Sequence, residues 1–295
     1  MPWWEFSVSC HAAELEQIEN LLLDLGAVSI SLSDARDEPI YEPLPGDTPV
    51  WQFSIVSGLF DPGIAHEDLY QQFVGTLPGH LLGGVGQHAL PDQDWEQVYK
   101  QHFKPICCTP GLWIVPSWCE APEPDAINIR LDPGIAFGTG SHPTTALCLA
   151  WLGEHRVKDY VVIDYGCGSG ILAIAACKLG ARQLVAIDID PQALNATESN
   201  TLANDIPTRQ IHTSTPAALE PGKFDLLMAN ILSGPLLDLA PRFADLVKPG
   251  GEILLSGILK TQLEAIQLAY KPFFELEQAC YREDWVRVSG IRSHV

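Results

Sequence analysis

The sequence lacks the patterns that mark metal-binding and disulfide-bonded proteins. Its eight cysteines show no C-x-x-C spacing, and no histidine, cysteine and aspartate cluster has the spacing of metal ligands. Cys148, Cys167 and Cys177 stand among apolar residues or glycines, which is typical of reduced, buried thiols. We therefore expect a protein of a reducing compartment, the cytoplasm, with no metal.

The sequence also lacks the motifs of membrane-spanning segments, signal peptides and serine hydrolases. No apolar run approaches the roughly 18 residues of a membrane span, so we expect no membrane contact. The opening residues M-P-W-W-E-F lack a basic stretch followed by an apolar core, and we expect no signal peptide. No serine lies in a G-x-S-x-G motif, which argues against a hydrolase with a nucleophile elbow.

Basic residues are scarce. Lysine and arginine number 17 against 37 acidic residues, for a net charge of -20. Binding along a nucleic acid needs a basic stripe, so this composition argues against it. The charge favours a basic partner, although solubility alone would also account for it.

The most informative stretch is residues 161–191, which read as a βαβ unit. A short apolar run, Val161 to Asp164, enters a turn that contains Gly166, Gly168 and Gly170. An apolar helix follows, and a second strand ends at Asp188. A carboxylate at this distance from the glycines can accept both hydroxyls of an adenosine ribose.

The spacing of the glycines distinguishes between two cofactor classes. It is G-x-G-x-G, whereas the dinucleotide fingerprint is G-x-G-x-x-G. The pattern is closer to the turn that binds S-adenosylmethionine (AdoMet), whose methionine amino group is a cation. Asp164 precedes the turn, where its charge would complement that amino group.

The first part of the chain predicts a separate domain. Its pattern gives strands over residues 3–9, 27–33, 50–59 and 79–90, with helices over 12–26 and 66–77. This β-α-β-β-α-β order implies a smaller, ferredoxin-like α+β domain over residues 1–90. Residues 91–111 are expected to form a linker helix and hinge, and residues 112–295 the α/β domain.

A second glycine-rich stretch, D-P-G-I-A-F-G-T-G-S-H-P-T-T, covers residues 132–145. It leads into a helix that begins near Pro143, and its free N–H groups suit an anion such as the AdoMet carboxylate. His142 is either the cap of this helix or a general base. Phe137 either covers the cofactor or substrate or anchors the loop.

Beyond the central unit, Phe224 to Ala229 is an apolar strand that ends at Asn230. A polar residue at the carboxyl end of a parallel strand faces the ligand crevice. The remaining strands, over 252–258, 273–280 and 285–289, complete a mostly parallel, seven-stranded sheet of the Rossmann-like class I methyltransferase type.

These motifs, together with A-I-D-I-D-P and A-N-I-L-S-G-P-L, resemble the ribosomal protein L-eleven (L11) methyltransferase family, PrmA, over essentially the whole chain. The resemblance implies that the N-terminal domain binds the basic ribosomal protein. It also implies that the other domain methylates the N-terminal α-amine and lysine ε-amines of that ribosomal protein. It also implies that Thr145, Gly166, Asp188 and Asn230 bind AdoMet. Tyr165 stands where the family commonly has an aliphatic residue, and N-I-L replaces the N-P-P-Y of amide-methylating enzymes.

Asn230 and, as an alternative base, His142 are the catalytic candidates, and we expect a monomer. Three other functions remain open. The first is methylation of another protein or of RNA, and the second is a nicotinamide-dependent oxidoreductase. The third is a binding module without catalysis. The acidic charge disfavours RNA, while the N-I-L strand end and the 132–145 loop disfavour the oxidoreductase.

Overall fold

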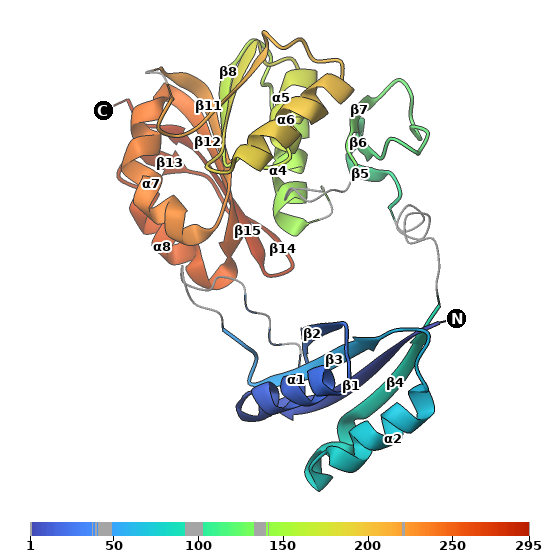
Figure 1. Cartoon of the computed structure of the whole chain (residues 1–295). Helices are drawn as coiled ribbons and strands as arrows, with labels where there is room; N and C mark the ends of the chain where they lie inside the picture. The colour runs from blue at the N-terminus through green and yellow to red at the C-terminus, as the bar shows by residue number, and fades with distance from the viewer. Residues whose placement is uncertain are drawn as a thin grey trace. The chain divides into compact units, whose positions relative to one another are not determined.

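The computed structural model describes residues 2–36, 38, 40, 49–91, 103–132, 140, 142–219 and 222–294. The chain divides into two compact units, Met1–Val98 and Tyr99–Val295, and each is described by itself (Figure 1). Most of the linker helix predicted within residues 91–111 lies outside the described residues. So does most of the 132–145 loop, including Phe137.

The first unit follows the predicted β-α-β-β-α-β order. Its four strands form one antiparallel sheet in the order β2-β3-β1-β4. The segment predicted as a strand over 79–90 begins instead as a short 3₁₀ helix, and only its second half joins the sheet. The elements are β1 (Trp3–His11), η1 (Ala12–Glu14), α1 (Leu15–Asp24), β2 (Ser29–Asp34), β3 (Phe53–Phe60), α2 (His66–Thr76), η2 (Gly79–Gly84) and β4 (Val85–Leu90).

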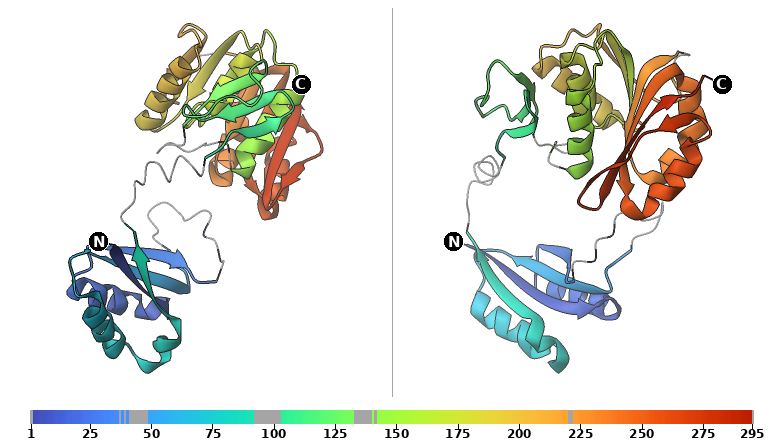
Figure 2. Two further views of the ribbon diagram at one scale, coloured as in Figure 1. Left: turned by 90° about the vertical axis from the view of Figure 1, so that its right-hand side faces the viewer. Right: turned by 180° about the vertical axis from the view of Figure 1, so that it is seen from behind.

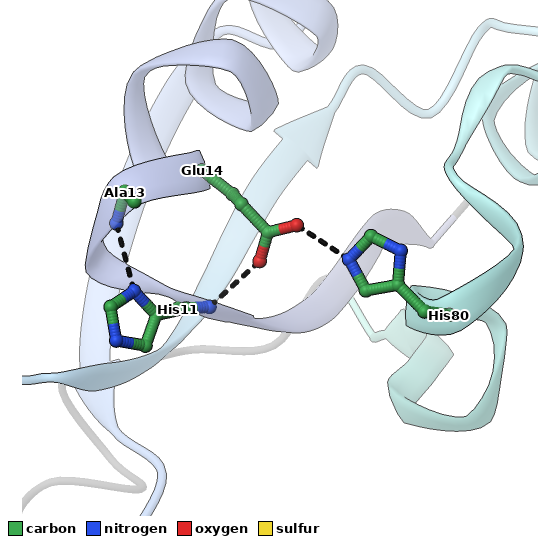
Figure 3. A network of polar contacts seen from close by, with 4 residues as sticks. All are labelled: His11, Ala13, Glu14 and His80. Carbon is green, nitrogen blue, oxygen red and sulfur yellow. Dashed lines mark hydrogen bonds and ion pairs between the residues drawn. The ribbon is translucent and has the colours of Figure 1, made fainter.

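One face of this sheet carries the core. Phe6 and Val8 alternate with more exposed residues along β1, and they pack with Ile18 of α1 and Phe73 of α2. Both helices therefore cover the same face, which Figure 2 shows from two further sides. A polar contact also links η2 to η1, just before α1. The carboxylate of Glu14 accepts from the backbone N–H of His11 and lies 2.6 Å from Nε2 of His80 (Figure 3).

The second unit begins with a small three-stranded sheet of β5 (Ile106–Thr109), β6 (Leu112–Val115) and β7 (Ile127–Arg130). The sequence assigned residues 106–109 to the hinge, and this was wrong. Ile106 and Cys108 pack against the core of the second unit, and β5 pairs with β6 in antiparallel register. The segment is therefore an integral part of this unit.

The rest of the second unit alternates helices and strands before a final antiparallel group. Its elements are α4 (Pro143–Glu154), β8 (Val161–Tyr165), α5 (Ile171–Lys178), β9 (Gln183–Ile187), α6 (Pro191–Ala203), β10 (Ile211–Ser214), β11 (Phe224–Asn230), α7 (Ser233–Leu246), β12 (Val247–Leu259), η3 (Lys260–Gln262), α8 (Leu263–Tyr270), β13 (Phe274–Leu276), β14 (Cys280–Arg282) and β15 (Trp285–Arg292).

The large sheet is mixed. Its strands run β10-β9-β8-β11-β12 in parallel, and β15 then pairs antiparallel with β12, β13 and β14. The sequence predicted seven strands, whereas this sheet has eight. The difference arises because the predicted strand over 273–280 is interrupted at residues 277–279, so that it forms both β13 and β14.

Helices cover both faces of this sheet. The core that contains residues of α4 and α5 lies on one face, and the core that contains residues of α7 and α8 lies on the other (Figure 1). Strands buried on both sides must be apolar along their whole length, which explains why β8 and β11 read as continuous apolar runs. Across the described ranges, no helix is both long and apolar enough to cross a membrane.

Candidate functional site

The turn between β8 and α5 requires its glycines. Gly166, Gly168 and Gly170 all have positive φ, at 84°, 55° and 79°, a conformation that other residues rarely adopt. A Cβ on Gly166 would lie 2.2 Å from Cγ2 of Ile231. The turn therefore approaches the end of β11 too closely for any side chain at position 166.

Backbone and side-chain bonds hold the turn against the end of β9. The N–H groups of Gly166 and Cys167 donate to the carbonyl of Ile187 over 2.7 and 2.9 Å. The Asp188 carboxylate accepts from the N–H of Gly168 over 2.9 Å and from the N–H of Asp190 over 3.0 Å. Two of the predicted cofactor residues, Gly168 and Asp188, are thus in direct contact.

Four polar side chains follow one another across the carboxyl ends of four adjacent parallel strands. In the sheet register Asp164 lies beside Ala186 and Met228, and Asn230 lies beside Ser256. Residues two apart on a strand share a face, so these side chains all lie on the face that α4 and α5 cover. We call this set the carboxyl-edge row: Asp188, Asp164, Asn230 and Ser256.

Asp164 is the more buried of the two carboxyl groups in the row, with 1% of its surface exposed. Its Oδ2 accepts a hydrogen bond of 3.1 Å from the N–H of Ala173, in the first turn of α5. Its Oδ1 is buried and has no hydrogen-bond partner among the residues that the structure describes. Burial raises the pKa of Asp164 to about 7; the Ala173 N–H opposes this rise, and the charge of Asp188 adds to it.

Asn230 joins β11 to the helix that follows the second glycine-rich stretch. Its Nδ2 donates to Oγ1 of Thr145 over 3.3 Å, and Thr145 is fully buried in α4. Its Oδ1, by contrast, is buried and meets no hydrogen-bond partner within the described ranges. The amide is therefore held at its donor end, while its acceptor end can still take a hydrogen bond from a ligand.

His142 caps helix α4. Its Nδ1 accepts from the N–H of Thr144 over 3.3 Å and lies 2.7 Å from the Thr144 hydroxyl. Its ring packs edge-on against Trp285 of β15, with centroids 5.0 Å apart. Burial lowers the pKa of His142, and the nearby Glu283 partly offsets this effect.

Sequence reasoning overlooked three residues that build this site. Thr197 of α6 donates to the carbonyl of Gly168 over 3.0 Å, and Ser256 completes the carboxyl-edge row. The rule that selected Asn230 would also have selected Ser256, because both are polar residues near the end of an apolar strand. Trp285 had no such signal, since its contact with His142 depends on the sheet topology.

The described residues contain no group of three histidine, cysteine or acidic side chains placed to hold a metal ion. The polar groups that converge here are instead carboxylates, an amide, hydroxyls and the backbone of the glycine turn that leads into α5. Such groups suit an organic ligand with both cationic and hydroxyl functions.

Comparisons with known proteins agree with one another. The profile of the family described as ribosomal protein L11 methyltransferase (PrmA) matches residues 2–293. The ribosomal protein L11 methyltransferase of Cellvibrio japonicus (strain Ueda107) is 45% identical over 297 residues, which is 99% of each chain. That of Pseudomonas fluorescens (strain SBW25) is 46% identical over 298 residues, covering 99% of this chain and 100% of the relative.

Among solved structures, the ribosomal protein L11 methylase from Lactobacillus delbrueckii subsp. bulgaricus is 37% identical, with a TM-score of 0.60. The match covers 65% of this chain and 100% of that one. The family expected from the sequence motifs is thereby confirmed, and the fold of the second unit is that of an α/β methyltransferase. This chain belongs to the ribosomal protein L11 methyltransferase (PrmA) family.

Proposed function

We propose that this protein transfers methyl groups from AdoMet to amino groups of ribosomal protein L11, both the N-terminal α-amine and lysine ε-amines. The observation that supports this reaction is the hydrogen bonding of the Asn230 side chain. Its Nδ2 is bound to Thr145, and its buried Oδ1 has no partner. A buried acceptor without a partner is costly, and an amine N–H is the donor that it lacks.

The residues of the site fit AdoMet. The Asp188 carboxylate at the end of β9 would accept the ribose hydroxyls, and Gly166 and Gly168 would let the ligand approach the backbone closely. Asp164 would face the cationic amino group of the methionine moiety. Thr145 and Asn230 would border the methyl group, and Phe137 would cover the cofactor.

Residues of the protein position the substrate amine and favour its uncharged form. When bound, AdoMet supplies an electrophilic methyl group on a sulfonium sulfur. A lysine amine has an ordinary pKa of about 10.4, so roughly one in a thousand is neutral near pH 7.4. Oδ1 of Asn230 would hold the neutral amine by accepting its N–H, and burial would disfavour the charged form. The protein thus contributes mainly position and desolvation.

We assign His142 a positioning role, although it was an alternative base on sequence grounds. Its Nδ1 accepts from the N–H of Thr144 in the first turn of α4, so the proton of the neutral ring lies on Nε2, which is then a donor and not a base. The cap holds Thr144 and Thr145 in the first turn of α4, next to Asn230. The histidine would therefore act through the helix rather than on the reacting amine.

We assign substrate recognition to the N-terminal ferredoxin-like domain, residues 1–90, and catalysis to the domain predicted over 112–295, which β5 extends back to Ile106. The connection predicted over 91–111 is shortened accordingly. Up to Val98, Arg36 is the only lysine or arginine in a strongly acidic sequence. Such a domain complements a basic ribosomal protein and repels nucleic acid. We expect the protein to act as a monomer in the cytoplasm.

The function is tested by incubating the protein with AdoMet and L11 that has never been methylated, and measuring S-adenosylhomocysteine. The expected result is cofactor turnover with L11 but none with L11 whose amines have been acetylated, because acetylation removes the nucleophile. A ribosomal RNA fragment is the competing acceptor. Turnover with the RNA alone would refute the assignment and support the alternative of RNA methylation.

A further inference from the structure

The carboxyl group of Asp164 is poorly solvated for a charged group. It is fully buried between the end of β8 and the first turn of α5, and Ala173 donates a hydrogen bond to its Oδ2. A carboxylate can accept about four hydrogen bonds, yet Oδ1 accepts none from the part of the chain that the structure describes. A buried charge without partners is strongly disfavoured, and such a group binds a proton instead.

No cation among the described residues acts on Asp164; the positive charge of Arg287 in β15 acts on the neighbouring Cys148 instead. The titratable groups that act on it or feel its charge are Asp188 at the end of β9, Cys167 of the turn and Cys148 of α4. Burial raises the pKa of both thiols to about 12, so they are neutral. Asp188 adds a negative charge, which also favours the protonated form of Asp164. Burial is the main cause that raises the pKa of Asp164 to about 7; the Ala173 N–H opposes this rise, and the charge of Asp188 adds to it.

The missing partner of this carboxyl is a cation at the glycine turn. The proposed cofactor carries one, because an α-ammonium group has a pKa of about 7.7–8.0 and is protonated at pH 7. An ammonium group within a few ångströms of a carboxyl favours its ionised form and lowers its pKa by one or more units.

We infer that Asp164 carries a proton in the cofactor-free protein and releases it to solvent when the methionine ammonium group of AdoMet binds at the glycine turn. The inference rests on the proposed function, since it assumes that AdoMet binds here. The proton passes from the Asp164 carboxyl to the buffer, and no bond of the cofactor changes. Cofactor binding is thereby linked to pH through one buried side chain.

The test is titration calorimetry of the wild-type protein in two buffers of equal pH but different ionisation enthalpy, phosphate and Tris. The difference in heat gives the number of protons released. With S-adenosylhomocysteine, which keeps the amino group, we expect about half a proton per ligand near pH 7, where Asp164 titrates. If the bound ammonium group lowers this pKa by about two units, the release should rise to about 0.8 proton at pH 6 and decline toward zero above pH 8. With 5′-methylthioadenosine, which lacks the amino acid moiety, we expect no release.

A pair of variants assigns the proton to its residue. Asp164→Asn should abolish the release, and its affinity for S-adenosylhomocysteine should no longer rise between pH 6 and 8. Glu252→Gln is the matched control, because burial also raises the pKa of Glu252, but this residue lies opposite Leu226 on β12, before Ser256 and outside the carboxyl-edge row. This control should keep the full release.

Equal release with the two ligands, or undiminished release from Asp164→Asn, would overturn the inference while leaving the proposed function intact. So would binding of S-adenosylhomocysteine without any release at pH 6. Failure of both AdoMet and S-adenosylhomocysteine to bind would instead refute the proposed function, and the inference with it. If Asp164→Asn does not fold, the inference is tested on the wild-type protein alone, by comparing proton release with S-adenosylhomocysteine and with 5′-methylthioadenosine.

Discussion

The side-chain amide of Asn230 donates to Oγ1 of Thr145 over 3.3 Å, and this bond joins the end of β11 to the first turn of α4. It fixes which end of the amide is available, since the donor end is engaged and the buried oxygen has no partner. A carbonyl oxygen that accepts from the amine holds the nucleophile in place without adding a charge, while burial disfavours the ammonium form. The function proposed for this protein depends on that arrangement.

Replacing Asn230 tests this arrangement. Asn230→Ala should lower the rate of methyl transfer by about 100-fold, because the amine loses its positioning partner. Asn230→Asp should also be slow, and its rate should rise at higher pH than that of the wild type, since a carboxylate stabilises the ammonium form of the substrate. Rates against pH for both variants and for Asn195→Ala, an exposed residue on α6, provide the check. A wild-type rate in Asn230→Ala would contradict the assignment.

Asp188 is expected to govern affinity for the cofactor. Asp188→Asn removes the charge that accepts from Gly168 and that would accept the ribose hydroxyls. Charge-assisted hydrogen bonds contribute about 1.5–3 kcal/mol, so AdoMet binding should weaken by roughly 10- to 100-fold. The neighbouring Asp190→Asn is the control, because Asp190 caps α6 and asparagine caps equally well. Calorimetric titration should show unchanged affinity in this control variant.

Gly166 is expected to tolerate no side chain. Gly166→Ala would impose a φ of 84° on alanine and bring its Cβ to 2.2 Å from Ile231. The backbone conformation alone costs about 1–2 kcal/mol, so the melting temperature should fall and AdoMet binding should weaken. Adding Ile231→Ala should restore part of the loss by removing the clash.

Gly75→Ala is the matched control for this substitution. Gly75 lies in α2 with open space around its Cβ position, and alanine favours helix by about 0.5–1 kcal/mol. This variant should therefore melt at a higher temperature than the wild type. A destabilisation as large as that of Gly166→Ala would show that the local fold has been misassigned.

His142 provides a prediction about pH. Since burial lowers its pKa in the folded protein, the unfolded chain binds a proton first as pH falls. The free energy of unfolding should therefore decline below the ordinary histidine pKa of about 6.5. In His142→Asn this contribution to the decline should disappear, while the helix cap and most of the methyl transfer rate remain. Loss of the rate by 100-fold or more would identify His142 as the base instead.

The sequence predicted those parts of the site that depend on local pattern. The strand, glycine turn, helix and acid of residues 161–191 form one continuous unit, so their spacing alone placed Gly166, Gly168 and Asp188. The hydrogen bond between Asn230 and Thr145 could not be predicted, because it depends on how β11 and α4 pack. The strand β5 was assigned to a hinge for the same reason, since its pairing with β6 and its burial are tertiary effects.

The most direct test of amine methylation on L11 uses AdoMet with a deuterated methyl group and intact-mass spectrometry of unmethylated L11. With the wild-type protein, we expect the mass of L11 to increase in steps of one deuterated methyl group. With Asp188→Ala, we expect no increase. Tandem spectra should place the groups on the N-terminal α-amine and on lysines. An unchanged mass of L11, in a sample where the protein is shown to bind AdoMet, would contradict the claim.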